Sequence, residues 1–203
     1  NLKLELKDKK SLFLLVGNTC PWCHRTIITT ELKQLSQINK IYLKPNIENG
    51  EWMFDKFFFG FKTVTDLYKK LVQDKYLRAT LPLLISVSQN NIEIISNESC
   101  EIIEILNQLN DEGENIIRLE NCEKDFLNKI HYQINNGVYK CGFARNQESY
   151  VKASYELFKS LNEINLYMND SEGPWIFGNN LTYADIYLFP TMIRWELIYS
   201  KLF

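Results

Sequence analysis

The sequence predicts an α/β domain followed by an all-helical domain. In the first half, short apolar runs typical of strands alternate with helical patterns. In the second half, beyond a polar stretch that contains Gly113, the apolar residues recur at helical spacing only. The length of 203 residues is sufficient for two small domains with cores of their own.

The first half opens with a buried strand and a helix. Leu12 to Val16 is a short apolar run, and the residues from Trp22 to Leu35 have a helical spread of apolar positions. This helix should begin around Pro21, because proline is tolerated in a first helical turn. Ile41 and Leu43 indicate a second strand.

A hairpin and a helix complete the first domain. The apolar runs 83–87 and 92–95 flank Gln89-Asn90-Asn91, which is a turn signal, and a helix is expected from about Glu98 to Leu109. The predicted order is β-α-β, a long connection, and then β-β-α. A parallel pair followed by an antiparallel hairpin is the thioredoxin-like plan.

The stretch 110–120, polar at its start, is the expected boundary between the domains. It separates a thioredoxin-like domain, residues 1–110, from an all-helical domain, residues 121–203. One helix should contain Phe126, Leu127 and Ile130, and a long second helix is marked by Ala153, Leu157, Leu161 and Ile164. A further helix should start at Thr182 as N-cap, with Asp185 three residues on in a capping-box arrangement.

Composition and charge exclude several functional classes. A formal net charge of −2 gives no electrostatic reason to expect nucleic acid or an anionic membrane as partner. The apolar run 12–16 is too short to span a bilayer, and no leader pattern opens the chain. The chain has five cysteines, and the isolated ones, Cys100, Cys122 and Cys141, favour a reducing compartment and hence a cytoplasmic location.

The motif Cys20-Pro21-Trp22-Cys23 carries the chemistry. If Cys20 lies at the start of the predicted helix, free amide donors and the helix dipole favour its thiolate. A cysteine so placed is a good nucleophile toward a mixed disulfide or thioether. Cys23 follows one helical turn later, within reach for a disulfide. Zinc needs about four ligands, and the chain has no second CxxC and only two histidines, so no metal is expected.

Two further segments fit a peptide-binding site. In thioredoxin-like sites, a proline placed as Pro82 is cis, which leaves the N–H and C=O of the preceding residue, here Leu81, free to pair with a peptide. Glu98 and Ser99 open the next helix, where amides and a hydroxyl can hold a carboxylate. An ordinary strand-entry proline and ordinary helix capping are the structural alternatives.

Taken together, these residues resemble the glutathione transferase superfamily, and more narrowly its Xi class, the glutathionyl-hydroquinone reductases. "CPWCHR" is similar to the family's CPWAHR, and "GEWMF" to its tryptophan-containing loop. "TLPLL" and "SNESCEII" are similar to the segments that hold glutathione. "INNGVYKCGFARNQESY" and "LTYADIYLFPTMIRW" resemble a family signature and its final-helix motif, so the resemblance covers nearly the whole chain.

The resemblance implies that Cys20 attacks the sulfur of a glutathionyl-hydroquinone, with glutathione as co-substrate. The aromatic part leaves as hydroquinone, and a second glutathione resolves the Cys20–glutathione disulfide. Matching positions place Trp52 against glutathione or the aromatic substrate, and Leu81, before Pro82, against the tripeptide backbone. The resemblance also assigns Glu98 and Ser99 to the γ-glutamyl end of glutathione and Arg78 to one of its carboxylates. It places Tyr139 and Tyr199 near the quinone oxygens.

The chain departs from the family pattern in two respects. The family usually has alanine where Cys23 stands, so a dithiol route of the omega or glutaredoxin type stays open, as does a non-catalytic protein that binds an aromatic ligand. Family members also extend beyond both limits of this chain. We therefore expect the helical domain to be incomplete at its C-terminus, which leaves the oligomeric state, including a homodimer, undecided.

Overall fold

The computed structural model describes residues 10–72, 78–89, 91–109, 116 and 121–203. The chain divides into two compact units, Asn1–Glu114 and Asn115–Phe203. The expected boundary at 110–120 lies, apart from Ile116, outside the described residues. The domain limits 1–110 and 121–203 therefore stay a prediction.

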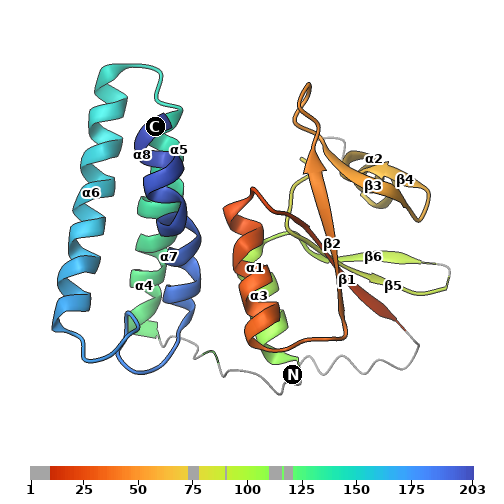
Figure 1. Cartoon of the computed structure of the whole chain (residues 1–203), viewed down its shortest axis with the longest axis horizontal. Helices are drawn as coiled ribbons and strands as arrows, with labels where there is room; N and C mark the ends of the chain where they lie inside the picture. Colours follow the sequence, from red (N-terminus) through yellow and green to blue (C-terminus); the bar gives the residue numbers. More distant parts are fainter. Residues whose placement is uncertain (1–9, 73–77, 90, 110–115, 117–120) are drawn as a thin grey trace. The chain divides into compact units, whose positions relative to one another are not determined.

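The first unit is built on a six-stranded sheet with the order β4-β3-β2-β1-β5-β6. Strand β1 (Ser11–Gly17) pairs in parallel with β2 (Ile38–Pro45) and antiparallel with β5 (Leu83–Val87). Strand β6 (Ile92–Ser96) returns antiparallel to β5. The predicted parallel pair and antiparallel hairpin are thus confirmed, and the arrangement is that of a thioredoxin-like sheet (Figure 1).

The predicted long connection between the second and third strands contains regular structure. It holds β3 (Trp52–Phe58), β4 (Phe61–Thr63) and helix α2 (Val64–Leu71). The aromatic run of β3 does not alternate apolar and polar residues, which is why its pattern did not indicate a strand. Thr63 caps α2, since its hydroxyl accepts a hydrogen bond from the N–H of Asp66 at 3.1 Å.

Helices α1 (Pro21–Leu32) and α3 (Ser99–Gln108) lie side by side on one face of the sheet, and α2 lies on the other side against β3 and β4 (Figure 1). The side chains of β1 and β5 are mostly buried on both faces of the sheet, which explains why these two strands read as continuous apolar runs. The side chains of β1 and β5 that are fully buried are Leu14, Leu15, Val16, Leu83, Leu84 and Ile85.

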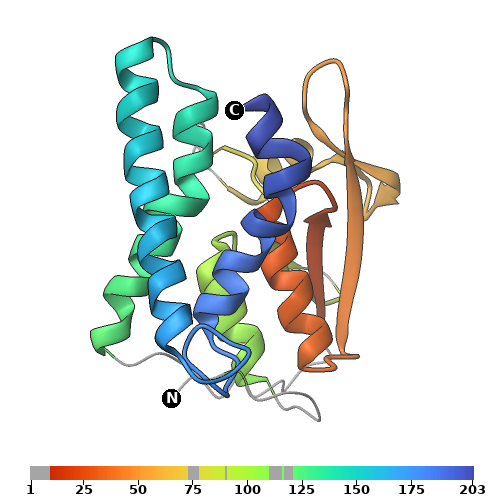
Figure 2. The ribbon, with the colours of Figure 1, turned by 60° about the vertical axis from the view of Figure 1, so that its left-hand side comes forward.

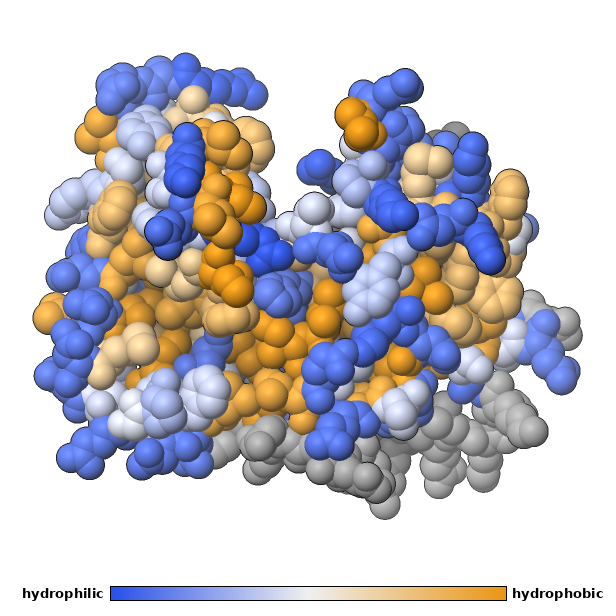
Figure 3. All heavy atoms as spheres, viewed as in Figure 1, coloured by the Kyte–Doolittle hydropathy of each residue, from blue (hydrophilic) through white to orange (hydrophobic). Residues whose placement is uncertain are grey.

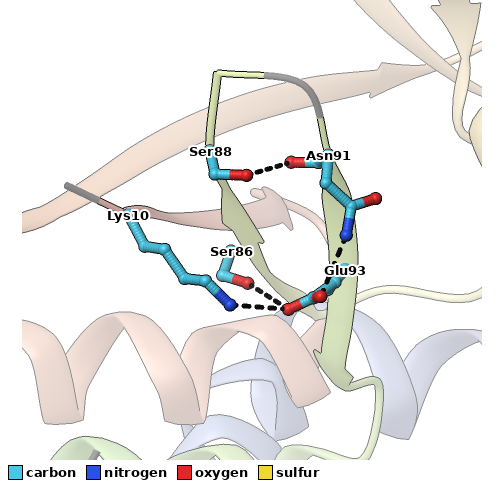
Figure 4. Close-up of polar contacts among 5 residues, drawn as sticks. All are labelled: Lys10, Ser86, Ser88, Asn91 and Glu93. Atoms are coloured by element: carbon cyan, nitrogen blue, oxygen red, sulfur yellow. Dashed lines mark hydrogen bonds and ion pairs between the residues drawn. The ribbon is translucent and has the colours of Figure 1, made fainter. Parts of the chain in front are cut away.

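A polar network lies at the β5–β6 hairpin, at one edge of the sheet (Figure 4). The carboxylate of Glu93 accepts hydrogen bonds from Lys10 at 3.0 Å, Asn91 at 2.9 Å and Ser86 at 3.4 Å. The hydrogen bond and the charge of Lys10 hold the pKa of Glu93 below its ordinary value. Charged groups on an edge strand also oppose pairing with another strand.

The second unit is helical. Its long helix α6 (Gln147–Asp170) matches the prediction and lies alongside α5, as Figures 1 and 2 show. The helix expected around Phe126 is the start of a longer run that includes a π-helical segment. The other elements are α4 (Asn121–Lys129), η1 (Ile130–Asn135), α5 (Asn136–Gly142), α7 (Tyr183–Arg194), η2 (Trp195–Tyr199) and α8 (Ser200–Leu202).

The predicted cap of α7 is present. Thr182 is the N-cap, and the carboxylate of Asp185 accepts hydrogen bonds from its backbone N–H at 2.9 Å and from its hydroxyl at 2.8 Å. The same carboxylate accepts from the N–H of Ile176 at 2.9 Å. Asp185 therefore also holds the preceding loop against the helix, which its position in the motif alone did not indicate.

A buried amide joins two segments of the helical unit. The side chain of Asn135 donates to the backbone oxygen of Tyr187 at 2.9 Å and to the hydroxyl of Thr191 at 2.6 Å. Asn135 belongs to the "INNG" part of the family-like signature, and these bonds fix η1 to α7.

Apolar side chains gather on the surface of the helical unit over α7 and the segments that follow it (Figure 3). Within the described ranges, no helix is long and apolar enough to cross a membrane. The exposed large apolar residues on α7, η2 and α8 are Phe189, Met192, Ile193, Leu197, Ile198 and Leu202.

Candidate active site

Cys20 is the N-cap of α1, in extended conformation, with Pro21 in the first turn as predicted. The turn before it is closed by a hydrogen bond from the N–H of Cys20 to the oxygen of Gly17 at 3.1 Å. The thiol is half-buried, and its Sγ lies 3.9 Å from the backbone oxygen of Leu81, to which the S–H can donate. A partly accessible sulfur thus lies at the N-terminal end of the helix.

The Leu81–Pro82 peptide bond is cis, as predicted. It lies directly before β5, and helix α2 contacts the residue that precedes this peptide bond. The hydroxyl of Tyr68, on α2, donates to the backbone oxygen of Thr80 at 3.1 Å. Helix α2 and the first turn of α1 therefore meet at the segment 80–82.

Trp52, expected in a loop, is the first residue of β3 and packs on the end of β1. A Cβ added to Gly17 would lie 2.3 Å from the indole of Trp52, so only glycine leaves room for this contact. The indole is half-buried. A small residue at the end of a central strand was the one signal in the sequence for this close approach.

Three of the predicted glutathione-binding residues share one cavity. Trp52, Arg78 and Leu81 line a cavity of about 660 Å³ between the β2–β3 connection, α2 and the segment before β5. A volume of this order is typical of small-molecule sites. Helix α2 and the residue that follows it add further lining residues, which are Val64, Thr65, Tyr68, Lys69 and Val72.

Glu98 and Ser99 are at the start of α3, as predicted, and do not line that cavity. Glu98 is the N-cap with an exposed side chain, and Ser99 is buried. The hydroxyl of Ser99 accepts a hydrogen bond from Nη1 of Arg25 at 3.4 Å. Arg25 lies on α1, so this bond connects the helix of Cys20 to the helix of Ser99.

Cys23 is fully buried, and its Sγ accepts a hydrogen bond from the N–H of Gly17 at 3.3 Å. Cys20, Cys23, Cys100 and Cys141 are free thiols. The side chain of Cys122 lies outside the described residues. Among the residues that the structure describes, no group of three or more His, Cys, Asp or Glu could hold a metal ion.

Tyr139 and Tyr199 belong to the second unit and pair with each other. Their hydroxyl oxygens are 3.3 Å apart, and their rings meet edge to face with centroids 5.9 Å apart. Tyr199 also lines a cavity of about 170 Å³ together with Cys141, the pKa of whose thiol is raised by burial. The pairing brings together two residues separated by 60 positions in the chain.

Gly17, Tyr68 and Lys69 take part in the contacts above, although the sequence assigned no role to them. Arg25 stands in the CPWCHR motif close to Cys20, and its spacing of three residues from Trp22 indicates that the two share one face of the helix.

Comparison with known proteins places this geometry in a family. Residues 125–198 match the family described as the glutathione S-transferase C-terminal domain. Glutathione S-transferase omega-like 2 of Schizosaccharomyces pombe is 31% identical, over 97% of this chain and 68% of the relative. The chain belongs to the glutathione transferase superfamily. The family and the thioredoxin-like plus helical fold expected from the sequence are thereby confirmed.

Structural neighbours assign this glutathione transferase to the Xi class. The Xi transferase of Phanerochaete chrysosporium superposes with a TM-score of 0.79 at 31% identity, over 94% of this transferase and 69% of that chain. The glutathionyl-hydroquinone reductase YqjG of Escherichia coli is 35% identical over 96% of this transferase. Its glutathione-bound structure superposes with a TM-score of 0.84. This transferase spans 62% of the length of that reductase.

Proposed function

We propose that the protein reduces glutathionyl-hydroquinones to hydroquinones with glutathione as co-substrate. The observation that carries the proposal is the position of Cys20. Its half-buried thiol lies at the N-terminus of α1 and 3.9 Å from the oxygen of Leu81, which lines the large cavity. The name of the Escherichia coli relative, a glutathionyl-hydroquinone reductase, supports the same reaction.

The reaction has two steps that balance. The Cys20 thiolate attacks the thioether sulfur of the substrate, a disulfide with glutathione forms, and the bond between sulfur and the ring breaks. The ring reacts in its keto form, so the electron pair of that bond passes through the ring carbon to a ring oxygen, which takes up a proton, and the hydroquinone leaves. A second glutathione, as thiolate, attacks the mixed disulfide, which releases oxidised glutathione and the Cys20 thiolate.

Glutathione bound at Cys20 would contact two parts of the first unit, the large cavity and the start of α3. Leu81, before Pro82, would pair with the tripeptide backbone, and Trp52 would lie against the tripeptide or the aromatic ring. Arg78, exposed at the rim of the cavity, would attract a carboxylate. At the start of α3, the carboxylate of Glu98 suits the ammonium of the γ-glutamyl group, and the hydroxyl of Ser99 suits its carboxylate.

Tyr139 and Tyr199 would place hydroxyl groups at the oxygens of the aromatic substrate. A phenol can donate a hydrogen bond to the negative charge that develops on a quinone oxygen as the bond to sulfur breaks. The separation of 3.3 Å between the two hydroxyls supports a joint role, because one hydroxyl can donate to the other and leave that second one to donate outward.

A thiol transferase of the omega or glutaredoxin type is the second candidate. It is favoured by Cys23, which lies on the first turn of the same helix as Cys20. In that reaction Cys23 would attack the mixed disulfide and form an internal disulfide with Cys20. A non-catalytic binder of aromatic ligands is the third reading, and the half-buried Cys20 thiol argues against it.

We also propose a cytoplasmic location, because the four described cysteines are free thiols, as in reducing compartments. The expected partners are glutathione and an aromatic small molecule rather than nucleic acid or membrane. A homodimer is a further proposal, which sedimentation of the protein would test.

Intact-protein mass spectrometry tests the proposed reaction. After mixing with a glutathionyl-hydroquinone, the protein should gain one glutathione on Cys20 while free hydroquinone is released in equal amount. Cys20→Ser should show neither product. Release of hydroquinone by Cys20→Ser at the wild-type rate would contradict the proposal.

A further inference from the structure

Arg25 connects the helix that carries the reactive thiol to the helix that carries Ser99. It lies on α1, five residues after Cys20, and is 1% exposed. Its Nη1 is 3.4 Å from the hydroxyl oxygen of Ser99 and 3.9 Å from the sulfur of Cys100, the first two residues of α3. Arginine is almost never buried without a specific set of contacts, so these contacts call for an explanation.

The guanidinium group is held in one orientation. It stacks on the indole of Trp22, with its central carbon 4.5 Å from the ring centroid. Trp22 and Arg25 are three residues apart on α1, which puts them on the same face of the helix. Because the guanidinium is planar, the stacking also fixes the direction of its N–H groups, and one of them is aimed at Ser99.

This geometry determines what Ser99 can offer a ligand. A serine hydroxyl has one proton and two lone pairs, and arginine can only donate hydrogen bonds. When Nη1 of Arg25 donates to the oxygen of Ser99, the serine proton must point to another acceptor. Donation to the oxygen also polarises the O–H bond and strengthens the bond that the serine donates.

We propose that Arg25 is a positioning residue for the γ-glutamyl site. It makes the Ser99 hydroxyl a donor and so directs it to the α-carboxylate of the γ-glutamyl group. This inference rests on the proposed function only in taking glutathione as the ligand. Arg25 does not touch the substrate or the reacting sulfur, and it acts through Ser99.

Glutathione binding to the full chain, measured by calorimetry, tests the proposal with two ligands. The first is glutathione, and the second is its analogue with the γ-glutamyl α-carboxylate converted to an amide. The variants are Arg25→Met, Ser99→Ala and their double variant, with Arg25→Lys as the conservative change and Arg145→Met, at an exposed arginine of the second unit, as the charge control.

We expect Arg25→Met to weaken glutathione binding about ten-fold, as the loss of a hydrogen bond to a charged group does. Binding of the amide should change less than about two-fold, and the double variant should bind no more weakly than Ser99→Ala, because the residues act as a unit. Arg25→Lys should recover part of the loss, and Arg145→Met should match the wild type.

Two results would overturn the proposal. One is an equal loss for both ligands, and the other is an additive loss in the double variant, since either would mean that Arg25 only supports the fold. If Arg25→Met fails to fold, Arg25→Lys measured with the two ligands decides the same question. Binding is measured without hydroquinone turnover, so a wild type that binds glutathione but reduces no glutathionyl-hydroquinone would refute the proposed function alone.

Discussion

The sulfur of Cys23 lies under the turn that leads to Cys20, where it accepts a hydrogen bond from the N–H of Gly17 at 3.3 Å. The residue is fully buried, whereas Cys20 is half-buried at the helix start. The two thiols of one CxxC motif therefore have different environments. One sulfur is part of the packed first turn, and the other is available to a substrate.

Alkylation should distinguish the two thiols. We expect Cys20 to react with iodoacetamide near neutral pH at least ten-fold faster than Cys23, because buried thiols are protected and thiolates at helix starts are reactive. The measurement compares Cys20→Ser with Cys23→Ser, with the modified cysteine identified by peptide mapping. A faster reaction at Cys23 would reverse the assignment of the nucleophile.

Turnover should not depend on Cys23. We expect Cys23→Ala to keep its rate on glutathionyl-hydroquinones within about three-fold, which is less than about 1 kcal/mol of barrier. Cys20→Ser should lose nearly all activity, because a hydroxyl is a much poorer nucleophile at neutral pH. Complete loss in Cys23→Ala, with a Cys20–Cys23 disulfide trapped in the wild type, would instead support the thiol transferase.

Gly17→Ala should displace the indole of Trp52. The added methyl group would lie 2.3 Å from the ring, and such overpacking typically costs about 1–3 kcal/mol of stability unless the neighbour moves. We expect weaker glutathione binding in Gly17→Ala. In a Trp52→Ala background the same substitution should be nearly neutral for binding. An equal effect in both backgrounds would show that Gly17 acts on something other than Trp52.

Asp185→Ala should destabilise the helical unit. The carboxylate accepts three hydrogen bonds, from Ile176 and from both donors of Thr182, and leaving buried donors without a partner costs about 1–3 kcal/mol. Urea unfolding followed by circular dichroism measures the change. Asp170→Ala, at the exposed end of α6, is the control and should change stability little.

Glu93→Gln should alter how stability depends on pH. The pKa of Glu93 is lowered in the folded state, so its ion pair stabilises the protein above the pKa of the unfolded state, which for glutamate is about 4.3. That contribution is lost as the pH falls through the lower, folded-state value. The difference in urea midpoint between wild type and Glu93→Gln should therefore be largest at neutral pH and low salt, and should vanish in acid. A difference independent of pH would contradict this origin.

Local patterns were sufficient wherever a short stretch of chain determines its own structure. The apolar runs of β1 and β5, the Pro21 helix start and the Thr182 cap depend on residues a few positions apart, and all are present as predicted. The family and the two-part fold could also be read from the order of such motifs. Strand β3 was missed because its aromatic run does not alternate apolar and polar residues and its pairing partners are distant in the chain. Helix α2 was missed although Val64, Leu67, Tyr68 and Leu71 recur at helical spacing over its eight residues.

The sequence by itself thus determined the fold class, the family and the candidate nucleophile. Only the tertiary structure decided which residues surround them. The indole of Trp52 on Gly17, the guanidinium of Arg25 on Ser99 and the pairing of Tyr139 with Tyr199 join positions that are 35, 74 and 60 residues apart. Such contacts leave no local period in the sequence, because only the packing of the sheet and helices brings these distant residues together.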